Sequence, residues 1–227
     1  MNPVILLDLD GTLVDSVPDL HAALDRMLLA RDLAPLSRAE ATAMIGDGVR
    51  ALVERALAAR GAVADEAAIT GFLADYEAHA AEETRLFPGI AAALAEMVER
   101  GWRLAVCTNK PERPARAILE GFGIGHLFAA IGGGDSFPVR KPDPAHVLAT
   151  LAAAGGGTAV MVGDHANDML AGSGAGLPVV FCGWGYGTGA MAGAAPVAAM
   201  VSDLVPLLAR LLACPLGGPL GGPLRTR

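Results

Sequence analysis

Asp8 and Asp10 are the first residues in the chain whose type and spacing suggest chemistry. They follow a short apolar run, in the segment Asp8-Leu9-Asp10-Gly11-Thr12, and residues two apart on an extended backbone point to the same side. Two carboxylates about 4 Å apart repel by roughly 4 kcal/mol at an effective dielectric constant of about 20, so the pair requires a cation, a proton or a separating turn. Mg²⁺ would meet this requirement, whereas an isolated pair of this kind is typical of a solvated turn or a helix cap.

Polar residues also follow later apolar runs. Thr108 and Asn109 follow one run, and Asp164 follows another, with Asp168 one helical turn beyond it. Lys141 lies between them in the chain, directly before a proline. Each residue alone would be typical of a surface or a turn, but the ordered set is improbable as a series of independent turns. We therefore expect these side chains to meet in one site.

Four short strands of a parallel sheet are the elements expected to position these residues. Continuous apolar runs of this length are typical of strands that are buried on both faces. The runs are Val4 to Leu7, Leu104 to Cys107, Ala159 to Val162 and Val179 to Cys182. Helical periodicity follows in Ile90 to Arg100, Pro114 to Gly121 and Ala145 to Ala153. This alternation predicts a doubly wound α/β fold, in which ligands bind beyond the carboxyl ends of the strands.

The stretch 14–83 breaks the alternation because its periodicity is helical throughout. We therefore expect an inserted all-helical cap over residues 15–83, and an α/β core made of residues 1–14 and 84–212. Hinges at the two ends of the cap would let it open and close. The last residues, 213–227, repeat Pro and Gly in units of four and are expected to be disordered.

Composition limits the partners and the compartment. The formal net charge of −7 disfavours binding to nucleic acid or to an anionic membrane surface. Cys107, Cys182 and Cys214 lack the spacing of a metal site or a disulfide framework, which favours a reducing compartment. The N-terminus does not resemble a signal peptide, and the apolar segment near 200–214 is interrupted by charge and proline. A cytoplasmic location is expected.

Together these motifs resemble those of the haloacid dehalogenase-like hydrolase superfamily. The resemblance covers Val4 to about Leu211, and its four motifs are Asp8 to Ser16, Thr108-Asn109, Lys141-Pro142 and Gly163 to Asp168. It implies a Mg²⁺-dependent phosphatase in which Asp8 attacks phosphorus and becomes an aspartyl phosphate. Asp10 would protonate the leaving oxygen and then activate water.

The same resemblance implies roles for the remaining residues. Mg²⁺ would be held by the Asp8 and Asp164 carboxylates and the Asp10 backbone carbonyl, with Asp168 supporting these ligands from farther out. Lys141 would supply positive charge to the phosphoryl group that is transferred. Lys141 and Thr108 would both be catalytic residues. The residues expected to contact phosphate or substrate through neutral groups are Thr12, Thr108 and Asn109.

Further segments resemble the phosphoglycolate phosphatase branch of the superfamily. These segments are Asp8 to Leu20, Ile45 to Leu57, Thr108 to Pro111 and Gly133 to Asp135. The branch implies 2-phosphoglycolate as substrate, with the backbone of a cap turn at Gly46 and Gly48 near the anion and Arg50 on its carboxylate. The alternative is a plain interhelical turn with a solvated Arg50. Asp47 departs from the branch, which often carries a neutral residue there.

Other functions stay open from the sequence. Sugar phosphates and nucleoside monophosphates are alternative substrates, and a sugar phosphomutase would use the same motifs. A phosphoacceptor signalling domain also combines acidic pairs, a Thr and a Lys, but it would accumulate phosphate and turn over slowly. The helical insertion and the presence of Asp10 favour an enzyme over such a switch. The expected partner is a small phosphate monoester, and the expected assembly is a monomer or homodimer.

Overall fold

The computed structural model describes residues 2–213, and its centre is a six-stranded parallel sheet with the strand order β5-β4-β1-β6-β7-β8. The strands are β1 (Val4–Leu7), β4 (Arg103–Cys107), β5 (Phe128–Gly132), β6 (Ala159–Gly163), β7 (Val179–Cys182) and β8 (Val197–Ala198). The predicted doubly wound α/β fold is therefore confirmed. Four of the six strands were predicted, and β5 and β8 were not.

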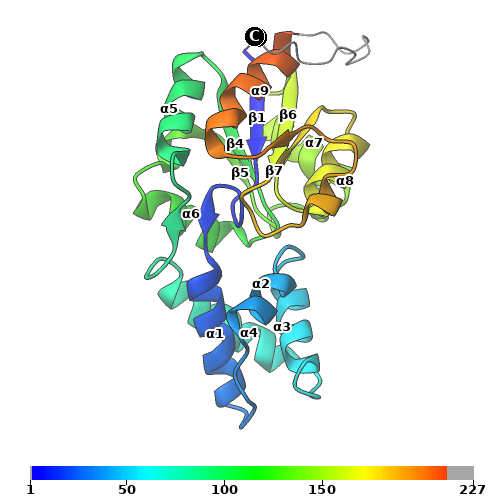
Figure 1. Ribbon diagram of the computed structural model, residues 1–227. Coiled ribbons are helices and arrows are strands. Elements are labelled where there is room, and N and C mark those ends of the chain that lie inside the picture. The colour runs from blue at the N-terminus through cyan, green and yellow to red at the C-terminus, as the bar shows by residue number, and fades with distance from the viewer. Residues whose placement is uncertain (1, 214–227) are drawn as a thin grey trace.

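Helices cover both faces of this sheet (Figure 1). One face packs against α5 (Ile90–Glu99), α6 (Glu112–Gly121) and α9 (Val201–Ala213). The other packs against α7 (Pro144–Ala153) and α8 (Ala166–Gly174). Short 3₁₀ turns lie at Gly125–Leu127 and Gly189–Ala192. Within residues 2–213, no helix has both the length and the apolar character needed to cross a membrane.

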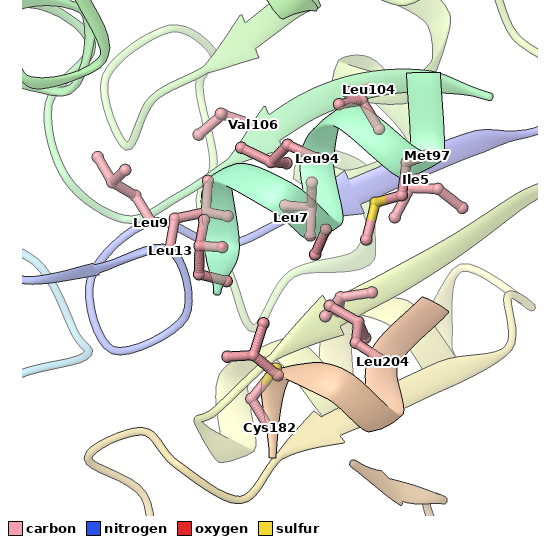
Figure 2. Close-up of a cluster of buried hydrophobic side chains, with 14 of the residues drawn as sticks. Ile5, Leu7, Leu9, Leu13, Leu94, Met97, Leu104, Val106, Cys182 and Leu204 are labelled. Atoms are coloured by element: carbon pink, nitrogen blue, oxygen red, sulfur yellow. The ribbon is translucent and has the colours of Figure 1, made fainter. Parts of the chain in front are cut away.

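The alternation of side chains along β1 explains why the strand is apolar throughout. Ile5 and Leu7 lie in the hydrophobic cluster beneath α5 and α9, as Figure 2 shows. Val4 and Leu6 point the other way, into the cluster beneath α7 and α8. Since successive residues of a strand face opposite sides of the sheet, a central strand covered on both faces must be apolar at every position.

The stretch between β1 and α5 contains four helices with a hydrophobic cluster of their own, which extends from Leu20 to Ala80. The helices are α1 (Val17–Leu29), α2 (Arg38–Met44), α3 (Val49–Ala58) and α4 (Glu66–His79). Figure 1 shows them beyond one end of the main sheet. We refer to α1–α4 and the loops between them as the helical cap. The division into a cap at 15–83 and a core at 1–14 and 84–212 stays a prediction.

A two-stranded antiparallel ribbon connects the helical cap to the sheet. It pairs β2 (Val14–Asp15), on the way into the cap, with β3 (Arg85–Leu86), on the way out. Just inside the ribbon, the buried Asp19 carboxylate accepts hydrogen bonds from the backbone N–H groups of Glu83 and Thr84, each at 2.9 Å. The two connections are therefore held together. Of the predicted tail 213–227, all but Ala213, the last residue of α9, lies outside the described residues.

Candidate active site

The strand order brings the polar residues of the first, second and fourth motifs to one edge of the sheet. Leu7 on β1 pairs with Val106 on β4 and with Val162 on β6. Since all three strands run in the same direction, the residues that follow them emerge together. Asp8, Thr108 and Asp164 are these residues. From β1 the sheet extends through β4 to β5 on one side, and the later strands β6 to β8 lie on the other side. Open α/β sheets bind ligands at such a reversal of strand order.

Asp8 is largely buried and contacts a buried lysine. Its Oδ1 atom lies 3.0 Å from Lys141 Nζ and accepts a 2.7 Å hydrogen bond from the backbone N–H of Leu9. Burial raises the pKa of Asp8 to about 6, although the positive charge of Lys141 opposes the rise. The lysine therefore helps to keep a nearly solvent-free carboxylate ionised.

Lys141 lies between two carboxylates and has almost no contact with solvent. Besides Asp8, its Nζ contacts Asp168 Oδ1 at 2.6 Å and donates to the Cys107 carbonyl oxygen at 2.6 Å. Burial alone would lower the pKa of Lys141, but the charges of Asp168 and Asp8 outweigh it and raise this pKa. Lys141 therefore carries a fixed positive charge beside Asp8.

Asp164 is held by hydrogen bonds on both carboxylate oxygens. Oδ1 accepts from the Thr12 hydroxyl, and Oδ2 from the backbone N–H of Tyr186, each at 2.8 Å. A side chain at Gly11 would collide with this carboxylate, because an added Cβ would lie 2.2 Å from Oδ2, and the φ of +82° also favours glycine. Burial, with repulsion from Asp8 and Asp168, raises the pKa of Asp164 to about 8.

Asp8, Asp164 and Asp168 form a buried acidic cluster in which one carboxylate oxygen from each residue lies within 4.8 Å of the other two. Lys141 balances one of the three negative charges, so ionised carboxylates here require a further cation. Hard oxygen donors suit Mg²⁺, and the residues therefore fit the predicted metal. Both oxygens of Asp168 are already used, by Lys141 and by the backbone N–H of His165. Since both oxygens of Asp164 also accept hydrogen bonds, this occupancy does not distinguish Asp168 from Asp164. The assignment of Asp8 and Asp164 as direct ligands, with Asp168 in a supporting position, stays a prediction.

Asp10 lies outside the acidic cluster and has its own partners. Lys110 Nζ contacts its two oxygens at 2.9 and 3.1 Å, and the Ser16 hydroxyl donates to Oδ1 at 2.5 Å. Lys110 is buried, and its ammonium lies 4.5 Å from the ring centre of Tyr76 on α4. Burial would lower the pKa of Lys110, but the charge of Asp10 outweighs it and raises this pKa. Neither Lys110 nor Tyr76 was predicted, although Lys110 directly follows the predicted Asn109.

Thr108 and Asn109 follow β4 and, with Asp8 and Asp10, line a cavity between the edge of the sheet and the helical cap. The Thr108 hydroxyl oxygen accepts from the backbone N–H of Lys110 at 3.2 Å. Asn109 Nδ2 donates to the carbonyl oxygens of Gly46 and Lys141, each at 2.9 Å. The amide N–H groups of Asn109 thus connect the helical cap to the loop that carries Lys141.

The cap turn at Gly46 and Asp47 contacts the core directly. Asn167 Nδ2 donates to Asp47 Oδ1 at 2.6 Å, and Asp47 also pairs with Arg55. Burial would raise the pKa of Asp47, but the hydrogen bonds from Asn167 and Arg55 outweigh it and lower this pKa. A Cβ at Gly46 would lie 2.8 Å from the His165 ring. The turn therefore requires a glycine, and the charge of Asp47 is compensated by Arg55.

Two predicted substrate contacts, Arg50 and Thr12, lie elsewhere. The Arg50 side chain is 49% exposed and pairs with Glu66 at 2.7 Å on the surface of the helical cap. Its neighbour Val49 faces the cavity instead, since consecutive residues of a helix point about 100° apart. Thr12 is buried and donates to Asp164, so it orients a candidate metal ligand and does not line the cavity. Both expectations of direct substrate contact are therefore corrected.

A small cavity of about 40 Å³ lies between the acidic edge of the sheet and the helical cap. Its core side is polar, and its cap side is mostly apolar. The lining consists of Asp8, Asp10, Leu20, Ile45, Gly46, Gly48, Val49, Leu52, Tyr76, Thr108, Asn109, Lys110, Asp164, His165 and Tyr186. Since one water needs roughly 10–15 Å³ on this measure, the cavity has room for only a few small groups in this arrangement.

His146 supports the loop of Lys141 and is fully buried. Its Nδ1 accepts from the backbone N–H of Lys141 at 3.2 Å. Burial, with the nearby charge of Lys141, lowers the pKa of His146 from 6.5 to about 4. The His146 ring therefore binds a proton more readily in the unfolded chain than in the folded protein. The contribution of neutral His146 to folding stability is complete above the unfolded pKa of 6.5 and is lost as the pH falls toward 4.

We expect His146→Asn to weaken this acid sensitivity, because Asn offers a neutral acceptor in place of Nδ1. Urea unfolding at several pH values, for both proteins, gives two stability profiles. Between pH 6.5 and about 4 the wild type should lose up to about 1.4 kcal/mol per pH unit more than the variant. Groups that titrate in both proteins contribute equally to the two profiles, so their effects cancel in the difference between the two free energies of unfolding. Parallel profiles would show that His146 does not carry the effect.

Comparison with known proteins gives consistent matches over most of the chain. A family model described as haloacid dehalogenase-like hydrolase matches residues 3–176. A phosphoglycolate phosphatase of Cereibacter sphaeroides (strain ATCC 17029 / ATH 2.4.9) is 46% identical over 188 residues, which cover 81% of this chain and 86% of that protein. One of Rhodospirillum rubrum is 43% identical and covers 82% of this chain and 81% of that protein.

Solved structures agree with these matches. The crystal structure of a predicted phosphoglycolate phosphatase from Haemophilus somnus 129pt superposes with a TM-score of 0.84 and 31% identity, over 91% of this chain and 98% of that one. CbbY from Rhodobacter sphaeroides, crystallised in complex with phosphate, gives a TM-score of 0.77 and 27% identity, over 90% and 96% of the two chains. Both similarities extend over the sheet and the helical cap.

Proposed function

The chain belongs to the haloacid dehalogenase-like hydrolase family, and we propose on this basis that it hydrolyses 2-phosphoglycolate to glycolate and phosphate with Mg²⁺. The enzyme is a phosphoric monoester hydrolase. The observation that carries the proposal is the grouping of Asp8, Lys141 and Asp164 beneath a helical cap that leaves a small cavity. Relatives with 43–46% identity are named for the same substrate.

Asp8 is the proposed nucleophile because its carboxylate lies at the carboxyl edge of the sheet with Lys141 on one oxygen. In the first step a carboxylate oxygen of Asp8 bonds to phosphorus, and the bond from phosphorus to the glycolate oxygen breaks. Lys141 stabilises charge on Asp8 and on the phosphoryl oxygens. Bound Mg²⁺, held by Asp8, Asp164 and the Asp10 carbonyl, would supply further positive charge to those oxygens.

Asp10 is the proposed general acid and base. It gives its proton to the departing glycolate oxygen in the first step. In the second step it takes a proton from water, the water oxygen bonds to phosphorus, and the bond between phosphorus and Asp8 breaks. Ser16 and Lys110 hold the Asp10 carboxylate apart from the acidic cluster and fix its position beside the cavity. The Thr108 hydroxyl oxygen accepts from the backbone N–H of Lys110. The hydroxyl proton of Thr108 is therefore available for donation to a phosphate oxygen.

The size of the cavity supports a small substrate over the alternatives. A cavity of about 40 Å³ favours the smallest substrates, because the helical cap would have to move farther to admit a nucleoside or a hexose than to admit 2-phosphoglycolate. A panel of 2-phosphoglycolate, a hexose phosphate and a nucleoside monophosphate, assayed for phosphate release, tests the proposal. The highest kcat/KM is expected for 2-phosphoglycolate. A much higher value for a sugar phosphate would contradict the substrate but leave the mechanism standing.

Mg²⁺ should stabilise the folded protein, because it would relieve the repulsion among Asp8, Asp164 and Asp168. A ligand present at about 100 times its Kd stabilises by roughly 2.7 kcal/mol, which corresponds to a Tm increase of several degrees for a chain of this length. Thermal unfolding with and without MgCl₂ measures the increase, and EDTA should reverse it and abolish phosphate release.

Asp164→Asn provides the control for this experiment, since it removes one proposed ligand and keeps the side-chain volume. Its Tm should respond little to MgCl₂. An equal increase in both proteins would place the metal site elsewhere.

A further inference from the structure

Lys110 is the one Lys or Arg side chain that lines the cavity among the described residues. The proposed substrate carries a carboxylate as well as a phosphate, so it has a second negative charge to be recognised. Lys141 is not available for this purpose, because it is enclosed by Asp8, Asp168 and the Cys107 carbonyl. Arg50, which the sequence suggested for this role, lies on the outer surface with Glu66. A cation for the carboxylate must therefore be sought at Lys110.

The backbone and side chain of Lys110 are both held in place. Its backbone N–H donates to Thr108 Oγ1 at 3.2 Å, and its carbonyl oxygen accepts from the Gly134 N–H at 2.8 Å. An ammonium group has three donors in a compact arrangement. Both of its hydrogen bonds to protein side chains go to Asp10, at 2.9 and 3.1 Å, on one side of the group. One donor remains for a ligand that enters the cavity.

Tyr76 supplies a second polar group at the same place. Its ring lies 4.5 Å from Lys110 Nζ, and it also lines the cavity. The phenol is 1% exposed, and its oxygen has no hydrogen-bond partner among the described residues. A buried hydroxyl without a partner costs free energy. An acceptor oxygen of a ligand would remove that cost.

The surroundings make this pair of donors effective. Leu20, Ile45, Val49 and Leu52 form the apolar side of the cavity around it. Hydrogen bonds and charge interactions are stronger when water is excluded. Tyr76 belongs to α4 of the helical cap, whereas Lys110 belongs to the core. The two donors come together only when the cap is docked on the core, as it is here.

We propose that Lys110 and Tyr76 form the subsite that binds the non-reacting carboxylate of the substrate. This inference rests on the proposed function and deepens it, since it assigns the choice of an anionic substrate to two residues. Lys110 also keeps its contact with Asp10, so recognition of the carboxylate takes place next to the group that protonates the leaving oxygen. A neutral alcohol at this end would accept weaker hydrogen bonds from the Tyr76 phenol and Lys110, because it carries no charge.

The test compares two substrates that differ in the charge of one end. 2-Phosphoglycolate carries a carboxylate, and 2-hydroxyethyl phosphate has a neutral alcohol of similar size. The measured quantity is the ratio of their kcat/KM values, because Lys110→Met will also disturb Asp10 and lower both rates. We expect this ratio to fall by roughly 10- to 100-fold in Lys110→Met and by about 10-fold in Tyr76→Phe, as for loss of a hydrogen bond to a charged group. Arg50→Gln is the matched control and should leave the ratio unchanged.

Binding provides a readout that does not depend on turnover. Calorimetric titration of Asp8→Asn protein with each substrate, with and without Lys110→Met, should show tighter binding of 2-phosphoglycolate that is lost in the double variant. Equal losses for both substrates in rate and binding would overturn the subsite and leave Lys110 as a positioning residue for Asp10. Loss of the preference in Arg50→Gln alone would also overturn it. Absence of phosphate release from every monoester would contradict the proposed function, whereas the binding comparison would still decide the subsite.

Discussion

Asp8→Asn should lower phosphate release by roughly four orders of magnitude or more, as removal of an essential nucleophile does in other hydrolases. The amide is a poor nucleophile, so the aspartyl phosphate does not form. The fold should persist, because Asn has nearly the same volume and can still accept from the Leu9 N–H, while Lys141 keeps Asp168 as a partner. Initial rates with 2-phosphoglycolate and a thermal unfolding curve measure the two effects separately.

Asp32→Asn is a suitable control for this substitution. Asp32 is exposed, far along the chain from the site, and has a positive φ of 56°, which Asn tolerates as well as Asp. Its rate and Tm should remain close to those of the wild type. If Asp8→Asn retained substantial activity with a freshly prepared protein, another group would have to attack phosphorus.

Lys141→Met should have the second largest effect, and it should affect both rate and stability. Loss of a cation that stabilises the developing charge should lower kcat by roughly 10²- to 10³-fold. Removing one partner from a buried ionic group typically costs about 3–5 kcal/mol, because the remaining charges are left uncompensated. Here Asp8 and Asp168 would lose the ammonium that lies 3.0 and 2.6 Å from them. Urea unfolding and steady-state kinetics are the measurements.

Two further variants show whether charge is the cause. Arg140→Met changes the exposed neighbouring residue and should have little effect on stability. The double variant Lys141→Met/Asp168→Asn removes a charge of each sign and should be more stable than Lys141→Met alone. A Lys141→Met protein as stable as the wild type would mean that the acidic cluster does not depend on this lysine.

The sequence predicted the strands whose apolar runs are continuous and missed those whose pairing decides their structure. β1 and β7 have the predicted bounds, and β4 and β6 differ by a single residue at one end. β5 lies at the edge of the sheet and is only partly buried. Its sequence, Phe-Ala-Ala-Ile-Gly, is apolar but consists largely of Ala and Gly, which are not typical of strands. β2 and β3 have two residues each and exist because they pair with each other. Such short elements leave no periodicity to detect.

The site shows the same division between local and tertiary information. The motif residues on β1, β4 and β6 were expected to meet because parallel strands end at one edge, and the structure brings them together. Lys110 was missed because a lysine beside a turn is usually solvated, and its burial depends on Tyr76 from a distant helix. The prediction for Arg50 was wrong because consecutive residues of α3 point in different directions: Val49 faces the cavity, whereas Arg50 faces the surface of the helical cap.

The ribbon of β2 and β3 has a consequence for engineering the molecule. Because Val14 pairs with Leu86 and Asp15 with Arg85, the polypeptide crosses between its two parts at adjacent points, with Cα atoms about 5 Å apart. A helical segment from another protein could therefore be transplanted as one piece if its ends lie equally close. The exchanged stretch should run from Val17 to Thr84, so that the hydrogen bonds from Glu83 and Thr84 to the Asp19 carboxylate stay within one segment. Ser16, which contacts Asp10, would remain with the host.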